Sequence, residues 1–293
     1  MNSRHNPRVL GCGPTPTPMP LSTASAPAIG FITYKPVAGF YDRVALALRE
    51  QLHVYIVDNS PDTTDAARLV AMLAADQGQR LHYMTPGRNA GLGTGLACLC
   101  ATAAAHGHQE LLFFDQDTSF TTETLHHMQA FVAGPLAALR STHAAVVFRG
   151  ADPRLTAGTV HDTLLAISSG MLVVLANARR MGWHDHSFFV DGVDYEFCLN
   201  ARAHGLRIGI CPGAPGFDHE SEQPDVPKRF LGRVWRLRRY ALRRIVDSLS
   251  AYLRLALRSA GRLDATAFAT VMRSASIFVL GQLLARVPLR RAD

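Results

Sequence analysis

Hydrophobic residues along this chain form short apolar runs that alternate with longer stretches rich in Ala and Leu. Short runs that end in turn-forming residues are typical of buried strands, whereas the longer stretches have the spacing of helices. The predicted strands are 29–34, 53–57, 81–84 and 111–114, and the predicted helices are 43–51, 64–76 and 93–106. Repeated strand, loop and helix units predict an α/β fold with a mostly parallel sheet flanked by helices.

Carboxylates follow two of the predicted strands. Asp58 ends the strand at 53–57, and Asp115 and Asp117 follow the strand at 111–114. In such sheets a ligand binds outside the carboxyl ends of the strands, so we expect these carboxylates on one rim. Two carboxylates at this spacing can offer oxygen ligands to one hard cation, Mg²⁺ or Mn²⁺.

A glycine-rich loop at 87–93 precedes the predicted helix at 93–106 and adds backbone donors and the side chain of Arg88. Such a loop at a helix N-terminus suits an anion, and Asp58 suits the base or ribose of a nucleotide. Each feature alone has an ordinary explanation, because a D-x-D triplet is more often a solvated turn and a glycine-rich loop often only caps a helix. Together, in this order, they predict a nucleoside-diphosphate pocket.

Six motifs follow one another along the chain: TYKP at 33–36, VDNS at 57–60, RNAGLG at 88–93, FDQDT at 114–118, SSGM at 168–171 and FVDGVDYEFCL at 189–199. In this order they resemble the family-two glycosyltransferases with a glycosyltransferase-A fold, and within them the rhamnosyltransferase-like branch that uses dTDP-rhamnose. The resemblance covers about residues 29–260, and the sequence departs from it at Lys35, where Asn is common, and at Asn200, where Arg is common.

The resemblance implies an inverting enzyme with a divalent metal and a nucleotide-sugar donor. Asp58 would contact the base or ribose, Asp115 the nucleoside side of the donor, and Asp117 the metal between the two phosphates. Arg88 and Asn89 are expected to contribute to donor binding. His219 falls where many relatives place a His near the diphosphate or metal, with a plain surface-loop His as the competing interpretation.

Asp194 matches the family's catalytic carboxylate and is the expected general base. If residues 193–203 form a helix, Asp194 lies in its first turn, where the helix dipole favours an ionised carboxylate. Asp191 and Glu196 lie near enough in sequence to compete for the role of base. If Asp194 is the base, Asp191 suits an acceptor-binding or supporting carboxylate, and Glu196 could orient a neighbour. Acidic residues also open helices for purely structural reasons.

Composition excludes wholesale disorder, collagen-like repeats and a disulfide-stapled miniprotein, since 48% of the 293 residues are hydrophobic and 18% are charged. The net charge of +7 divides unevenly: residues 1–227 hold 15 basic and 20 acidic groups, whereas residues 228–293 hold 15 and 3. We therefore expect a disordered arm at 1–28, a catalytic domain at 29–227 and a basic helical tail at 228–293. Five cysteines fit neither a zinc pattern nor a disulfide framework, which favours a reducing cytosol.

The tail is predicted to form an amphipathic helix from Leu231, with arginines on the face opposite its apolar residues. Such a helix suits an anionic membrane surface, and the ordinary alternative is a helix packed on the catalytic domain with a solvated Arg face. The apolar run at 277–284 is too short to span a bilayer, which takes about 20 residues. We therefore expect a peripheral protein at the inner face of the cytoplasmic membrane, acting on a glycan or lipid-linked acceptor of O-antigen or another surface polysaccharide.

Three other functions share some of these sequence features. A glycosyltransferase of the same fold with another nucleotide sugar shares every motif. A nucleic-acid-binding protein using the Arg-rich tail is disfavoured because the body is acidic. A nucleotidyltransferase would need a glycine-rich basic loop after the first strand, and TYKP at 33–36 does not provide one.

Overall fold

The computed structural model describes residues 26–36, 38–61, 71, 80–219, 226–230 and 233–287. The helix predicted at 64–76 falls almost wholly outside the described residues, as does nearly all of the arm predicted at 1–28. Strand β1 nevertheless begins at Ala28, the last residue assigned to that arm.

A central eight-stranded sheet has the order β3-β2-β1-β4-β8-β6-β9-β7. Strands β3, β2, β1 and β4 are parallel, β8 and β7 run against their neighbours, and β6 and β9 are parallel to each other. This confirms the predicted α/β class. The strands are β1 Ala28–Thr33, β2 Val54–Asp58, β3 Leu81–Met84, β4 Glu110–Asp115, β6 His143–Arg149, β7 His161–Thr163, β8 Met171–Val174 and β9 Arg207–Pro212, with a separate pair, β5 Thr118–Ser119 and β10 Asp218–His219.

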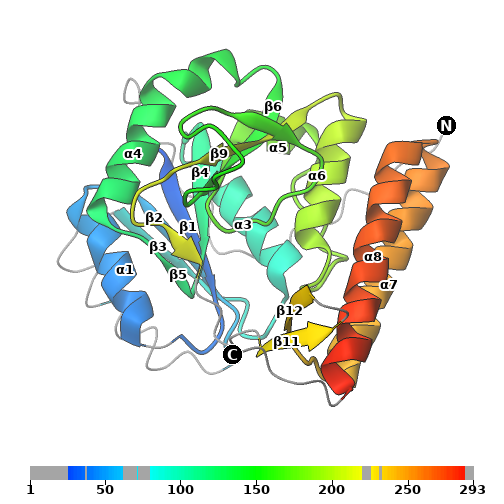
Figure 1. The fold of residues 1–293 in the computed structure, drawn as a ribbon. Helices are drawn as coiled ribbons and strands as arrows, with labels where there is room; N and C mark the ends of the chain where they lie inside the picture. The colour runs from blue at the N-terminus through cyan, green and yellow to red at the C-terminus, as the bar shows by residue number, and fades with distance from the viewer. Residues whose placement is uncertain are drawn as a thin grey trace.

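Helices cover both faces of this sheet (Figure 1). One apolar core joins the sheet to α1, α4 and the short 3₁₀ helix η2, and a second core joins its other face to α3, α5 and α6. Strands enclosed in this way carry apolar residues on both faces, as β2 shows with four buried apolar residues before the buried Asp58. The helices are α1 Ala38–Arg49, α3 Leu92–Ala105, α4 Thr122–Ala133, η2 Pro135–Ala138, α5 Leu175–Arg180 and α6 Val193–Ala203.

The C-terminal segment begins with two antiparallel strands, β11 (Val226–Phe230) and β12 (Arg233–Leu237). The prediction of a helix from Leu231 is therefore wrong as far as residue 241, and the predicted boundary at 227 lies within β11. Val234 and Trp235 favour strand pairing over helix. The amphipathic helix itself is present as α7 (Leu242–Gly261), which lies beside α6 and α8 (Figure 1).

Helix α8 (Ala265–Arg286) is longer than the apolar run at 277–284 suggested. The side chain of Asp264 accepts a hydrogen bond from the Ala267 amide and caps a helix of 22 residues. Its length and hydropathy suffice to cross a membrane, with 22% of its most apolar window buried, so the expectation that this segment is too short is wrong. Core helices of globular proteins can satisfy the same two criteria.

Four histidines gather around Tyr55 at the amino ends of β2 and β3. The His82 ring stacks on Tyr55 with centroids 4.3 Å apart, and the Tyr55 hydroxyl lies 2.8 Å from His106 Nδ1. His53 Nδ1 is 3.5 Å from His82 Nε2, and the His108 ring contacts His53 edge to face. Burial and mutual repulsion lower the pKa of His82 and of His108 to about 4.

Because these histidines are neutral in the fold, we expect stability to fall on acidification. The unfolded chain binds protons below about pH 6.5 while the folded cluster resists them until about pH 4, so the loss develops between these values. One such shift corresponds to roughly 2 kcal/mol or more between pH 7 and pH 4.5. Urea unfolding at the two pH values measures it. His82→Phe keeps the ring stack and should flatten the dependence, and an unchanged profile in this variant would contradict the assignment.

Candidate functional site

Asp58 ends β2 at the rim of the sheet and is fully buried. One carboxylate oxygen accepts a hydrogen bond from the Ser60 amide and the other from the Tyr83 hydroxyl, both at 2.8 Å. These bonds fix the carboxylate in orientation. No local pattern indicates Tyr83, which reaches Asp58 only because β3 pairs with β2.

The D-x-D triplet follows β4 and is fastened to β1 by its central residue. Gln116 Oε1 accepts hydrogen bonds from Thr33 Oγ1 at 2.9 Å and from the Tyr34 amide at 2.8 Å, and its carbonyl accepts one from Arg43. The triplet is therefore part of a bonded rim rather than a solvated turn. The motif contained Gln116, but its role needed the pairing of β1 with β4.

Ser169 supports the same triplet from the other side. It is buried, its hydroxyl shares a hydrogen bond with Thr118 Oγ1, and it accepts one from the Asp115 amide at 3.4 Å. The serine motif before β8 therefore stabilises the D-x-D loop.

Asp194 is brought to this rim by α6. The helix begins at Val193, as its predicted range indicated, and Asp194 is in its first turn. Burial, then the nearby carboxylates of Asp194 and Asp117, raise the pKa of Asp115 to about 8. Asp115 and Asp117 thus lie close to Asp194, although Asp115 and Asp194 are 79 positions apart in the chain. A cation at this place would relieve the repulsion between the three carboxylates.

This carboxylate cluster, Asp115, Asp117 and Asp194, fits a divalent cation in its chemistry. Mg²⁺ commonly takes one or two protein carboxylates and completes its shell with substrate phosphates and water. In the described ranges no group of three or more His, Cys, Asp or Glu side chains is arranged to hold a metal, so these carboxylates do not form a complete metal site by themselves. Asp117 remains the predicted protein ligand.

His219 stands close to the triplet by backbone pairing. Strand β10 is antiparallel to β5, with His219 opposite Thr118. Its side chain lies outside the described part of the structure, so its role at the diphosphate or metal stays a prediction.

The glycine-rich loop donates its amides within the protein. The Ala90 amide bonds to Asn59, the Gly91 amide to Asn89 Oδ1 and the Leu92 amide to the Phe189 carbonyl. These three amides are therefore committed to protein acceptors, in contrast to the predicted anion cradle. Arg88 and Asn89 are exposed, so donor contacts from this loop would come from their side chains.

Glycine is required where this loop meets the segment before α6. A Cβ at Gly93 would lie 2.6 Å from the carbonyl oxygens of Asp185 and Phe188. A Cβ at Gly91, which has a φ of 85°, would lie 2.6 Å from the Phe189 carbonyl oxygen. The two glycines thus allow the nucleotide loop and the segment leading to Asp194 to touch.

Asp191 and Glu196, the other two candidate bases, both contact α7. Asp191 accepts a hydrogen bond from Ser248 at 2.7 Å and lies 3.6 Å from Arg244. Glu196 is buried and pairs with Arg258 at 3.2 Å. Burial and the nearby Asp185 raise the pKa of Glu196 to about 7 against the opposing effect of Arg258.

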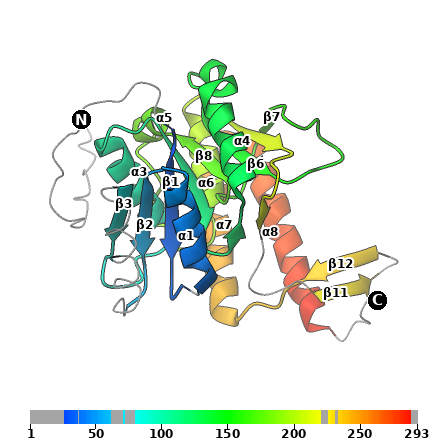
Figure 2. The same ribbon diagram turned by 90° about the vertical axis from the view of Figure 1, so that its left-hand side faces the viewer.

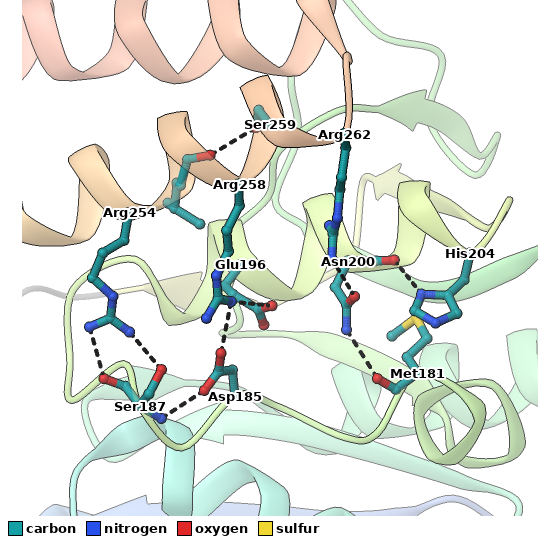
Figure 3. Close-up of polar contacts among 11 residues, drawn as sticks. Met181, Asp185, Ser187, Glu196, Asn200, His204, Arg254, Arg258, Ser259 and Arg262 are labelled. Atoms are coloured by element: carbon teal, nitrogen blue, oxygen red, sulfur yellow. Dashed lines mark hydrogen bonds and ion pairs between the residues drawn. The ribbon is translucent and has the colours of Figure 1, made fainter. Parts of the chain in front are cut away.

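Arginines on α7, together with Arg262 at its C-terminal end, form polar contacts with residues 185–200, the segment that contains the candidate base (Figure 3). Arg258 pairs with Asp185 at 2.7 Å as well as with Glu196, and Arg254 donates to the Ser187 carbonyl and hydroxyl at 3.0 and 2.6 Å. Arg262 and Asn200 meet at 3.4 Å. These arginines therefore face the catalytic domain, so neither predicted alternative, a cationic membrane face or a solvated Arg face, describes them.

Removing Arg258 should destabilise this contact. In Arg258→Ala the Glu196 carboxylate would stay buried without its partner. We expect the free energy of unfolding to fall by roughly 1–3 kcal/mol. This is less than for a fully buried pair, because Arg258 is 40% exposed. Arg243→Ala, which removes an exposed arginine from the same helix, should change stability by less than about 0.5 kcal/mol. Urea unfolding compares the two, and equal losses would contradict a specific role for Arg258.

Comparison with known proteins gives one curated relative and several structural neighbours, and no family model matches the chain. The dTDP-rhamnosyl transferase RfbF of Shigella flexneri is 25% identical over 197 residues, which are 62% of this chain. The match spans 64% of that relative's length.

Among solved structures, GalNAc-T7 with UDP, GalNAc and Mn²⁺ aligns with a TM-score of 0.51 at 9% identity, over 68% of this chain and 45% of that one. The mannosyltransferase PcManGT from Pyrobaculum calidifontis, with GDP-Man and Mn²⁺, aligns at 0.45 and 19% identity, over 65% and 57%. The comparisons confirm the glycosyltransferase-A fold and the resemblance to rhamnosyltransferase-like glycosyltransferases.

Proposed function

We propose that this chain, with its glycosyltransferase-A fold, is an inverting glycosyltransferase that moves a sugar, rhamnose from dTDP-rhamnose, onto a glycan or lipid-linked acceptor. The observation that carries the proposal is the convergence of Asp115, Asp117 and Asp194 at the rim of the sheet where β2 also ends, at the buried Asp58. A donor diphosphate needs positive charge at this acidic rim, and the relative RfbF is named for dTDP-rhamnose.

Each rim residue has a separate task in this proposal. Asp58, held by Ser60 and Tyr83, accepts hydrogen bonds from the nucleoside. Asp117 holds the divalent metal, Mg²⁺ or Mn²⁺, with His219 as a further ligand, and Asp115 contacts the nucleoside side of the donor. When bound, the metal neutralises the diphosphate and favours its departure.

The chemical step is a single displacement. Asp194 accepts the proton of an acceptor hydroxyl, the hydroxyl oxygen bonds to the anomeric carbon, and the bond from that carbon to the diphosphate oxygen breaks. Configuration inverts because attack and departure occur on opposite faces. Asp191 and Glu196 act as positioning residues, since their side chains bond to α7.

The acceptor is proposed to be a glycan or lipid-linked intermediate of surface polysaccharide such as O-antigen. The protein would then work at the inner face of the cytoplasmic membrane, with its basic C-terminal segment against an anionic lipid surface. That segment holds 15 basic and 3 acidic residues, which supports such a partner.

A donor screen tests the proposal. Purified protein with Mn²⁺ is titrated with dTDP-rhamnose, UDP-hexoses and GDP-mannose, and binding is measured by calorimetry. Tightest binding of dTDP-rhamnose is expected. Preference for another sugar nucleotide would keep the glycosyltransferase and change its donor, whereas binding of none would contradict the proposal.

A further inference from the structure

Helix α7 exposes an apolar stripe that no part of the chain described by the structure covers. Its members recur at spacings of four, three, four and four residues, which places them on one helix face. Their exposed fractions run from 38% to 74%. The opposite side of α7, with Ala251 and Leu255, is buried on the catalytic domain. The stripe consists of Leu242, Val246, Leu249, Leu253 and Leu257.

Helix α8 adds a second apolar surface beside it. The two helices are packed together, with the Tyr252 and Phe278 rings 5.9 Å apart (Figures 1 and 2). Exposed apolar area of this extent usually marks a protein or membrane contact. The exposed apolar residues of α8 are Phe268, Met272, Ile277, Val279, Leu280 and Leu283.

Positive charge borders this two-helix apolar face at the hairpin end. Arg229, Arg236, Arg239 and Arg243 are exposed there. Within 228–230 and 233–287, the described part of this segment, 13 basic residues face 2 acidic ones. A second copy of the chain would bring like charges together, whereas an anionic bilayer offers both apolar chains and negative head groups.

We propose that α7, α8 and the β11–β12 hairpin form a monotopic docking face for an anionic lipid bilayer. The apolar stripe enters the head-group boundary to a depth of about 5–10 Å, and the exposed arginines bind lipid phosphates. This inference deepens the proposed function and rests on it only for the acceptor. It reverses the expected orientation, because the leucines of α7 face the lipid while its inner arginines hold the catalytic domain.

Contacts at the end of α8 favour a helix that lies on the membrane rather than crossing it. Lys228 donates to the carbonyls of Ala285 and Val287 at 3.2 Å, and Gln282 donates to the Arg238 carbonyl at 2.9 Å. A spanning helix would lose these bonds and bury the mid-helix Arg273 in lipid.

The docking face also lies suitably for the active site. Strands β1 and β2 point toward the lower end of the molecule in Figure 2, and the hairpin lies at that end. Asp58 ends β2, and Asp115 ends β4, which is parallel to β1, so a docked bilayer would lie near the rim that carries both. A lipid-linked acceptor would reach the site without leaving the membrane.

Cosedimentation with vesicles tests the docking face. The full chain should bind vesicles of equal phosphatidylglycerol and phosphatidylcholine at least tenfold better than pure phosphatidylcholine. L253D/L257D should lose at least tenfold in binding, because two apolar anchors become charged. A130D/A133D, which adds the same charges to exposed positions of α4, should bind like the wild type.

The outcomes separate docking from catalysis. Vesicle binding without any sugar transfer would uphold the face and contradict the proposed function, whereas transfer to a soluble acceptor without vesicle binding would overturn the face alone. Resistance to alkaline carbonate extraction would overturn the monotopic orientation. A dimer in sedimentation equilibrium that L253D/L257D abolishes, without vesicle binding, would assign the face to a second copy.

Discussion

Asp194→Asn is expected to lower kcat by about 10²–10⁴-fold while leaving donor binding unchanged. The amide has the shape of the carboxylate but cannot take the acceptor's proton. Asp194 lies in the first turn of α6, and its charge acts on Asp115, so it shares the rim with the D-x-D carboxylates. Single-turnover transfer measures the step, and calorimetry with nucleoside diphosphate measures binding.

The matched variants Asp191→Asn and Glu196→Gln decide between the three candidates. Both residues bond to α7, so their variants should alter stability and acceptor KM more than kcat. Retained transfer in Asp194→Asn, with a collapse in either of the others, would move the base to that residue.

Sequence alone predicted the rim, but it ranked Asp194 above the neighbouring acids only through the family resemblance. Asp58, Asp115 and Asp117 end strands of a parallel sheet, and that topology places them together whatever the side chains do. Asp191, Asp194 and Glu196 are carboxylates within six positions of one another. In the structure, the packing of α7 takes up Asp191 and Glu196, and a contact across more than 50 residues leaves no local signal.

The C-terminal segment shows the same limit. Its helical spacing predicted α7 correctly as an amphipathic helix, but periodicity reports only that two faces differ. Periodicity does not report which of the two faces meets the catalytic domain. The arginine face does so because the domain offers it acceptors, namely Asp185, Glu196 and the Ser187 carbonyl. The hairpin at β11 and β12 was missed because its basic residues continue the charge pattern of the helix.

Asp117→Ala is expected to remove the response of the protein to divalent metal. Without this carboxylate the rim keeps Asp115 and Asp194 but loses the predicted ligand between the two phosphates. Transfer should fall by roughly 10³-fold, since charge stabilisation at a departing diphosphate is worth several kcal/mol. Calorimetry with dTDP, with and without Mn²⁺, should show equally weak binding in both conditions.

Asp58→Asn is the matched control for Asp117→Ala, because it alters the nucleoside end of the same pocket. It should weaken dTDP binding through the lost carboxylate contacts and still show stronger binding when Mn²⁺ is added. Circular dichroism establishes that both variants fold. Mn²⁺-dependent dTDP binding that survives in Asp117→Ala would place the metal on Asp115 and Asp194 instead. The D-x-D triplet would then supply its metal ligand through Asp115, while Gln116, bonded to Thr33 and Tyr34, holds the rim together.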